Sequence, residues 1–187
     1  MMVTDTKETI KKLLLTTQRP GIENLINWME EEGFFDAPCS SKYHLAEPGG
    51  LAKHSLNVFH TAIEEAIAFY QKKQNEITFE FVDSITLCSL LHDVGKTGQF
   101  GKPNYVPDSD SPNPAYKTNK ELLYIPHEVR SIVILSKFIE LTEEEQYAIL
   151  YHNGLYSNLD NFKGKETPLL MILHFADMWA SRVTEKE

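Results

Sequence analysis

Apolar residues recur every three or four positions along most of the chain, the spacing that places them on one face of an α-helix. After Gly50, for example, Leu51, Val58, Ala62 and Ala66 fall on one such stripe. The same pattern predicts helices over residues 5–17, 21–32, 51–70, 79–94, 126–140, 142–153 and 167–183. No stretch alternates apolar and polar residues as a half-buried strand does, so we expect no β-strand.

Helix start signals support these assignments. Thr142 and Glu145 have the spacing of a capping box, and Thr167 before Pro168 is typical of an N-cap followed by proline in the first turn. The acidic run 143–145 is interpreted as the acidic first turn of a helix and nothing more. We therefore predict an all-α fold, a compact bundle of six or seven helices that residues 1–187 form as a single domain.

Two stretches lack helical periodicity. Residues 34–50 contain two Pro, two Gly and several small polar residues, which is typical of a loop. Residues 97–119 are rich in Gly, Pro, Ser, Asn and Asp, and so long a connection is usually a functional loop or a lid. Its tyrosines and lysines could contact a substrate, although solvated lid residues are the simpler interpretation.

Composition and net charge limit the kinds of molecule that this protein is expected to bind. The chain has 187 residues, 42% of them hydrophobic, and its 18 Lys and Arg against 27 Asp and Glu give a net charge of −9. This balance argues against long nucleic acid or an anionic membrane as a partner, but not against a small phosphate ester. Two cysteines give no disulfide framework, and no segment resembles a signal peptide or is long enough to span a bilayer. We expect a cytoplasmic protein.

Several ionisable residues fall where the periodicity predicts core positions. His54 lies on the apolar stripe of its helix, His92 and Asp93 end a strongly apolar helix, and Asp177 lies between apolar residues of the last helix. One buried histidine is more often a hydrogen-bonded core residue than a ligand. The joint pattern is different, because a buried carboxylate is costly unless it is paired or binds a cation. Imidazole and carboxylate together suit a divalent first-row metal.

These residues resemble the H…HD…D signature of the HD superfamily of metal-dependent phosphohydrolases. The surrounding segments are similar too: Gly-Gly-Leu-Ala-Lys-His-Ser-Leu at 49–56, Leu-His-Asp-Val-Gly-Lys at 91–96 and His-Phe-Ala-Asp at 174–177. The resemblance runs from about Tyr43 to Trp179, and it implies an HD-domain helical bundle whose metal-binding core covers about residues 43–183.

The resemblance also implies a ligand set. Two further histidines complete an H…HD…H…H…D array that holds two divalent ions in some members of the superfamily, and Asp93 would bridge them. The implied ligands are His54, His92, Asp93, His127, His152 and Asp177. His127 and His152 could instead be helix-capping surface residues. Mn, Fe, Ni, Mg and Zn are not distinguished.

Three more residues are candidates for contact with a substrate. Asp93 and Lys96 are the implied catalytic residues, because Lys96 lies one turn after Asp93 and could contact a phosphate oxygen. By composition alone, Lys96 would be a solvated lysine after a glycine. His44 is expected at the rim of the cleft, and His174 either supports the ligands or binds the substrate.

The function that this pattern favours is metal-dependent hydrolysis of a nucleotide or another small phosphomonoester or phosphodiester by a metal-activated hydroxide. Two alternatives stay open: a di-iron oxygenase with the same ligands, and a nucleotide-binding regulator without turnover. HD-domain exoribonucleases share these sequence motifs but typically have an additional nucleic-acid-binding domain. Hydrolysis of long RNA is therefore not favoured. The chain could also form a homo-oligomer.

Overall fold

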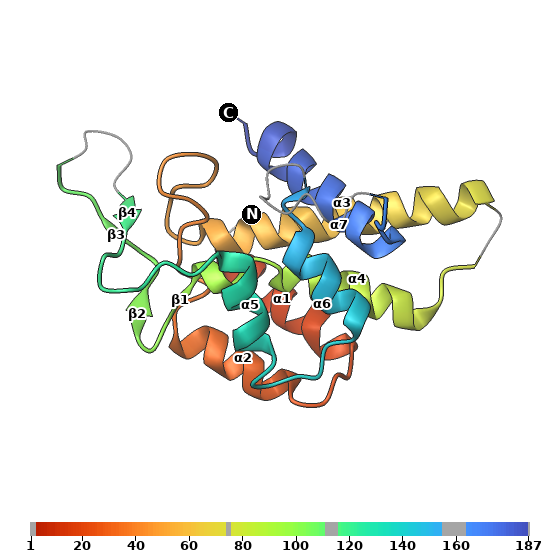
Figure 1. Cartoon of the computed structure of the whole chain (residues 1–187), viewed down its shortest axis with the longest axis horizontal. Helices are drawn as coiled ribbons and strands as arrows, with labels where there is room; N and C mark the ends of the chain where they lie inside the picture. Colours follow the sequence, from red (N-terminus) through yellow and green to blue (C-terminus); the bar gives the residue numbers. More distant parts are fainter. Residues whose placement is uncertain (1–2, 74–75, 111–115, 155–163, 187) are drawn as a thin grey trace.

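The computed structural model describes residues 3–73, 76–110, 116–154 and 164–186. These residues form seven α-helices and two short β-hairpins, which confirms the predicted all-α class (Figure 1). The helices are α1 (Val3–Thr16), α2 (Ile22–Glu31), α3 (Gly50–Lys73), α4 (Phe79–Leu91), α5 (His127–Leu135), α6 (Glu143–Tyr151) and α7 (Pro168–Trp179). None of the described helices is long and apolar enough to cross a membrane.

The long helix α3 is the centre of the bundle. It packs along α4 and α7, and α1 packs against both α3 and α4 on the side away from α7 (Figure 1). Residues 85–91 of α4 are all buried, so the second half of this helix is enclosed on every side. The chain therefore leaves α4 deep inside the protein, and His92 and Asp93 follow directly.

Side-chain caps start three of the helices. The hydroxyls of Thr78, Thr142 and Thr167 accept hydrogen bonds from backbone N–H groups in the first turns of α4, α6 and α7. The capping box at Thr142 and the Thr167-Pro168 start are thereby confirmed. Helix α5 ends at Leu135, five residues before the predicted Glu140, and turns replace its last part.

The acidic run 143–145 forms the first turn of α6 as predicted, but Glu145 does more than begin the helix. Its side chain is 0% exposed and accepts hydrogen bonds from Arg19, at 2.6 and 3.0 Å, and from the Ser84 hydroxyl at 2.8 Å. These contacts hold its pKa below the ordinary value even though burial alone would raise it. Glu145 therefore fastens the segment before α2 to α4 and α6.

The prediction of no β-strand is also wrong. Within residues 98–118, β1 (Gly98–Gln99) pairs with β2 (Lys102–Pro103), and β3 (Tyr105–Pro107) pairs with β4 (Tyr116–Thr118), both antiparallel. Strands of two or three residues are too short to show a period-two pattern. Gly98 and Gly101 have positive φ, which allows the tight first hairpin.

Buried Arg130 of α5 anchors these hairpins to the bundle. It is 4% exposed, and its guanidinium donates to Asn104 Oδ1 at 2.9 Å and to the Leu123 carbonyl at 3.0 Å. Residues 111–115 of the expected lid lie outside the described residues. The rest of this connection is a hydrogen-bonded structure attached to α5.

Candidate metal centre

Six side chains from five parts of the fold meet beside α3. They are His54 from α3, His92 and Asp93 after α4, His127 at the start of α5, His152 at the end of α6, and Asp177 from α7. Each belongs to at least one group of three whose ligand atoms all lie within 4.8 Å of one another. The structure therefore brings together all six residues that the sequence predicted as metal ligands.

Asp93 lies between two sets of imidazoles. Its Oδ1 is 3.1 Å from Nε2 of His127 and 3.6 Å from Nε2 of His152. Its Oδ2 is 3.4 Å from Nε2 of His92 and 3.6 Å from Nε2 of His54. Each carboxylate oxygen thus faces a different imidazole pair, which is the geometry that a bridging carboxylate needs.

All four imidazoles direct Nε2 toward Asp93, and an oxygen atom faces Nδ1 on the other side of each ring. For His92 and His152 this oxygen is the carbonyl three residues earlier, at 3.0 and 2.7 Å. For His127 it is the Glu128 carboxylate at 3.2 Å, and for His54 it is a distant carboxylate described below. An acceptor at Nδ1 keeps the proton there and leaves the lone pair of Nε2 for a metal.

A divalent cation fits this donor set. Nε2 of His54, Nε2 of His92 and Oδ1 of Asp93 are buried and have no hydrogen-bond partner among the described residues. Buried polar atoms without a partner are costly, and here three of them belong to one cluster. Imidazole nitrogens with carboxylate oxygens are a ligand set that Mn, Fe, Co, Ni and Zn accept.

The charges in the cluster are strongly coupled. Burial would raise the pKa of Asp93, but Lys96, His92 and His127 hold it well below its ordinary value. Burial and the neighbouring His92 lower the pKa of His152 to about 3, so this imidazole is neutral. Burial would also lower the pKa of His54, but Cys39 and the carboxylate of Asp177 raise it well above its ordinary value.

Lys96 is part of the same cluster. Its Nζ lies 2.6 Å from Asp93 Oδ2, and its side chain is 15% exposed toward the cleft. The negative charges of Asp93 and Asp177 raise the pKa of Lys96 despite its burial, so the ammonium stays charged. Asp177 Oδ1 lies 3.2 Å from Nε2 of His54, and its pKa is lowered, against the effect of burial, by His54 and His92.

Like Glu128 beside His127, Glu185 is a carboxylate of this site that the sequence pattern did not predict. It lies two residues beyond the expected core range, in a polar stretch after α7 that gives no periodic signal. Its side chain is 1% exposed and contacts His44, His54 and Asn57. Cys39 was not predicted as a site residue either, and its Sγ lies 4.0 Å from Nε2 of His44. Cys39, His44 and His54 form a further group with metal-ligand spacing.

His174 contacts the cluster from the side. Its Nδ1 donates to the backbone carbonyl of His152 at 2.7 Å, so it supports the end of α6. A Cβ on Gly154 would overlap the His174 ring, and Gly154 has a φ of +53°. Only glycine allows the imidazole to lie so close to the chain there.

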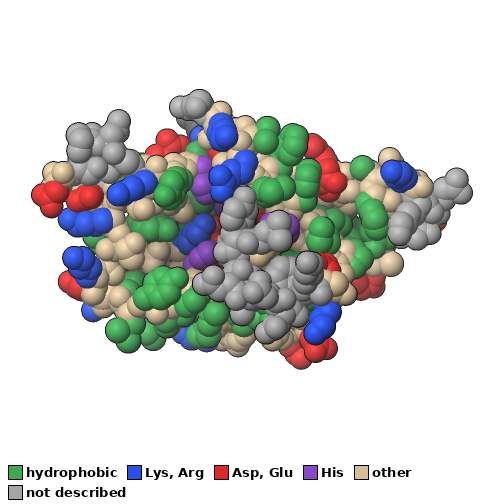
Figure 2. All heavy atoms as spheres, turned by 45° about the horizontal axis from the view of Figure 1, so that its top comes forward, with side chains coloured by type: hydrophobic (Ala, Val, Ile, Leu, Met, Phe, Trp, Pro, Cys, Tyr) green, Lys and Arg blue, Asp and Glu red, His purple; other side chains and the backbone are tan. Residues whose placement is uncertain are grey.

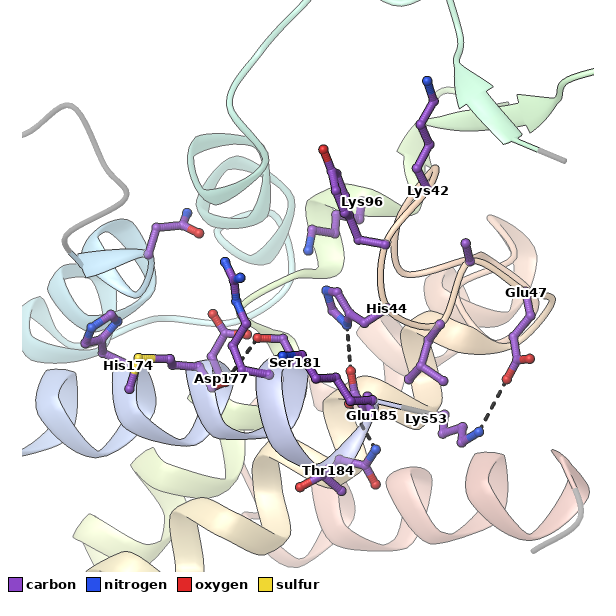
Figure 3. A pocket seen from close by; sticks show the side chains of 18 residues that line it. Lys42, His44, Glu47, Lys53, Lys96, His174, Asp177, Ser181, Thr184 and Glu185 are labelled. Atoms are coloured by element: carbon purple, nitrogen blue, oxygen red, sulfur yellow. Dashed lines mark hydrogen bonds and ion pairs between the residues drawn. The ribbon is translucent and has the colours of Figure 1, made fainter. Parts of the chain in front are cut away.

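A cleft of about 1170 Å³ opens onto the cluster. Figure 3 shows Lys96, Asp177 and His174 around it, with Glu185 from the turn after α7 beside His44 from the loop before α3. Figure 2 shows histidine side chains in the middle of this face with Lys and Arg beside them. The basic residues that line the cleft are Lys42, Lys53, Lys96, Arg182 and Lys186. Three carboxylates, those of Glu47, Asp177 and Glu185, line it too, so the cleft of this acidic protein has a small excess of basic side chains.

The chain is a distant homologue of the 3′-5′ exoribonuclease YhaM of Geobacillus sp. (strain WCH70). The two are 25% identical over 158 residues, which cover 80% of this chain and 44% of that protein. No protein-family model matches the chain, and no solved structure matches it significantly. The buried His/Asp cluster is consistent with the HD-domain resemblance of the sequence.

Proposed function

We propose that the protein is a metal-dependent phosphohydrolase that acts on a nucleotide or another small phosphate ester. One observation carries the proposal: each oxygen of buried Asp93 lies within 3.6 Å of the Nε2 atoms of two imidazoles. Distant homology to an exoribonuclease supports a hydrolytic enzyme.

Two divalent cations are proposed for this cluster. His54, His92 and Asp177 would hold one, His127 and His152 the other, and Asp93 both. Cations held here would polarise a phosphate ester and acidify water. Asp93 is buried and ionised, so it offsets their charge inside the protein.

The chain's own residues would bind and orient the phosphate. Lys96 keeps its charge and lies at the mouth of the cluster, so its ammonium can donate to a phosphoryl oxygen. His174 would hold the end of α6, and with it His152, in place. His44 would line the substrate side of the cleft.

The cleft supports a small substrate. Its volume of about 1170 Å³ is enough for a nucleotide. Lys42 and Arg182 on its walls supply local positive charge in a chain whose net charge is −9. This separation of charge favours a compact anion over a long polyanion.

The 3′ end of an RNA is the second candidate substrate, and the homology to an exoribonuclease favours it. This chain spans less than half of that relative's length, so the activity of the whole relative does not transfer by similarity alone. A short oligoribonucleotide could enter the cleft end first.

A hydrolysis screen tests the proposal. The protein, loaded with Mn²⁺, is incubated with phosphomonoesters, cyclic nucleotides, dinucleotides and a short oligoribonucleotide. Asp93→Asn is the test variant, and Asp36→Asn, the same change at an exposed aspartate, is the control. We expect product with the native protein and the control but not with Asp93→Asn. A metal-loaded native protein that releases no product from any substrate would contradict the proposal, and oxygen consumption would then be measured on the iron-loaded form.

A further inference from the structure

A buried carboxylate outside the HD signature joins three parts of the site. Glu185 Oε2 lies 2.6 Å from His44 Nδ1, and Oε1 lies 3.0 Å from His54 Nδ1. Asn57 Nδ2 donates to Oε1 at 3.0 Å. Glu185 therefore links the loop before α3, α3 itself and the turn that follows α7 (Figure 3).

The turn after α7 has an unusual shape. Residues Ala180–Thr184 form a π-helical turn, and the N–H of Glu185 donates to the Ala180 carbonyl at 3.0 Å, five residues earlier. Such a turn is wider than an α-helical one and is found often at functional sites. It packs against α3 and directs Glu185 toward His54.

We infer that Glu185 is a positioning residue that orients His54 toward the metal centre. Three donors converge on its carboxylate, which is ionised and can only accept hydrogen bonds. The Nδ1 proton of His54 is thereby held on the Glu185 side. Nε2 then faces Asp93 and Asp177, at 3.6 and 3.2 Å. This inference rests on the proposed metal-dependent function.

The role requires a carboxylate. A glutamine has one acceptor oxygen and one NH₂ group, so its NH₂ would face His44 Nδ1–H or the Asn57 amide. One of the three hydrogen bonds would become a contact between two donors. Outer partners of metal-binding histidines typically change metal affinity by about 10- to 100-fold when they are removed.

The test compares metal binding by Glu185→Gln, Glu185→Ala and Glu185→Asp with the native protein. Glu65→Gln removes the same charge from the exposed face of α3 and is the control. Mn²⁺ and Zn²⁺ affinities are measured by competition with a chelating dye, and circular dichroism checks that each variant is folded. The ¹⁵N shifts of His54 in the Zn²⁺-loaded protein report which ring nitrogen carries the proton.

We expect affinity to fall about 10-fold in Glu185→Gln and about 100-fold in Glu185→Ala. Glu185→Asp keeps the charge and should recover part of the loss, while Glu65→Gln should bind as the native protein does. Folded Gln and Ala variants with native metal affinity and an unchanged His54 Nδ1–H signal would overturn the inference. Native protein that binds no divalent metal would overturn the proposed function and the inference together. Native protein that binds metal, loses it in Glu185→Gln and hydrolyses nothing would overturn the function alone.

Discussion

Raising the pH from 6.5 to 9 should destabilise the metal-free protein through His44. Burial alone would lower the pKa of this imidazole, but its contacts with Cys39 and Glu185 raise it from 6.5 to about 9. A histidine whose pKa is raised in the folded state stabilises the fold fully below its unfolded pKa. That stabilisation is lost as the pH rises through the folded value.

The size of the effect follows from the shift. Each pKa unit corresponds to about 1.4 kcal/mol, so the rise from 6.5 to about 9 gives His44 about 3 kcal/mol of pH-dependent stability. Glu185 has the opposite sign: its depressed pKa contributes stability above the ordinary value of 4.5, and this is lost as the pH falls. Because burial lowers the pKa of His152 to about 3, this group also costs stability as the pH falls below 6.5, so the metal-free protein should be most stable near pH 6.5.

Urea unfolding in the presence of a chelator measures this dependence. The free energy of unfolding is compared at pH 6.5 and 9 for the native protein, His44→Gln and His60→Gln, an exposed histidine on α3. His54 contributes a trend of the same sign, so the decisive quantity is the difference between the native protein and His44→Gln. Between pH 6.5 and 9, we expect the native protein to lose about 3 kcal/mol more stability than His44→Gln. His60→Gln should lose as much stability as the native protein does. Equal losses of stability in the native protein and His44→Gln would refute the reasoning.

Three more predictions follow from other contacts. Metal affinity should rise about tenfold per pH unit above pH 6.5, because metal binding at Nε2 of His54 displaces a proton and the pKa of His54 is raised. Calorimetry in buffers of different ionisation enthalpy measures how many protons are released. A metal affinity that does not change with pH would exclude His54 as a ligand. Glu145→Ala should lower the free energy of unfolding in urea by about 3 kcal/mol, because it leaves the partly buried Arg19 without its carboxylate partner. A loss below about 1 kcal/mol would contradict this prediction. Gly154→Ala should lower metal affinity, because the added Cβ displaces His174. It should also lower the free energy of unfolding, because Gly154 has a positive φ. An unchanged metal affinity would show that His174 does not support the site.

The sequence by itself determined the helices and the groups that they bring together. Helical periodicity is local, so the stripe through Leu51 and Val58 was enough to place His54 on the buried side of α3. Buried polar residues in an apolar pattern were a second local signal, and they identified Asp93 and Asp177 before any contact was known. Capping signals such as Thr142 likewise depend on neighbours within one turn.

Only the tertiary structure decided the partners of these residues. Glu185 is 131 positions from His54, and Arg19 is 126 positions from Glu145, so no local pattern could pair them. A widened turn after α7 brings Glu185 back to α3, and an ordinary helical reading of its polar segment predicts a solvated side chain. Burial that follows local periodicity was enough to predict the positions of His54, His92 and Asp93, whereas the contact of Glu185 with His54 depends on how distant parts of the chain pack.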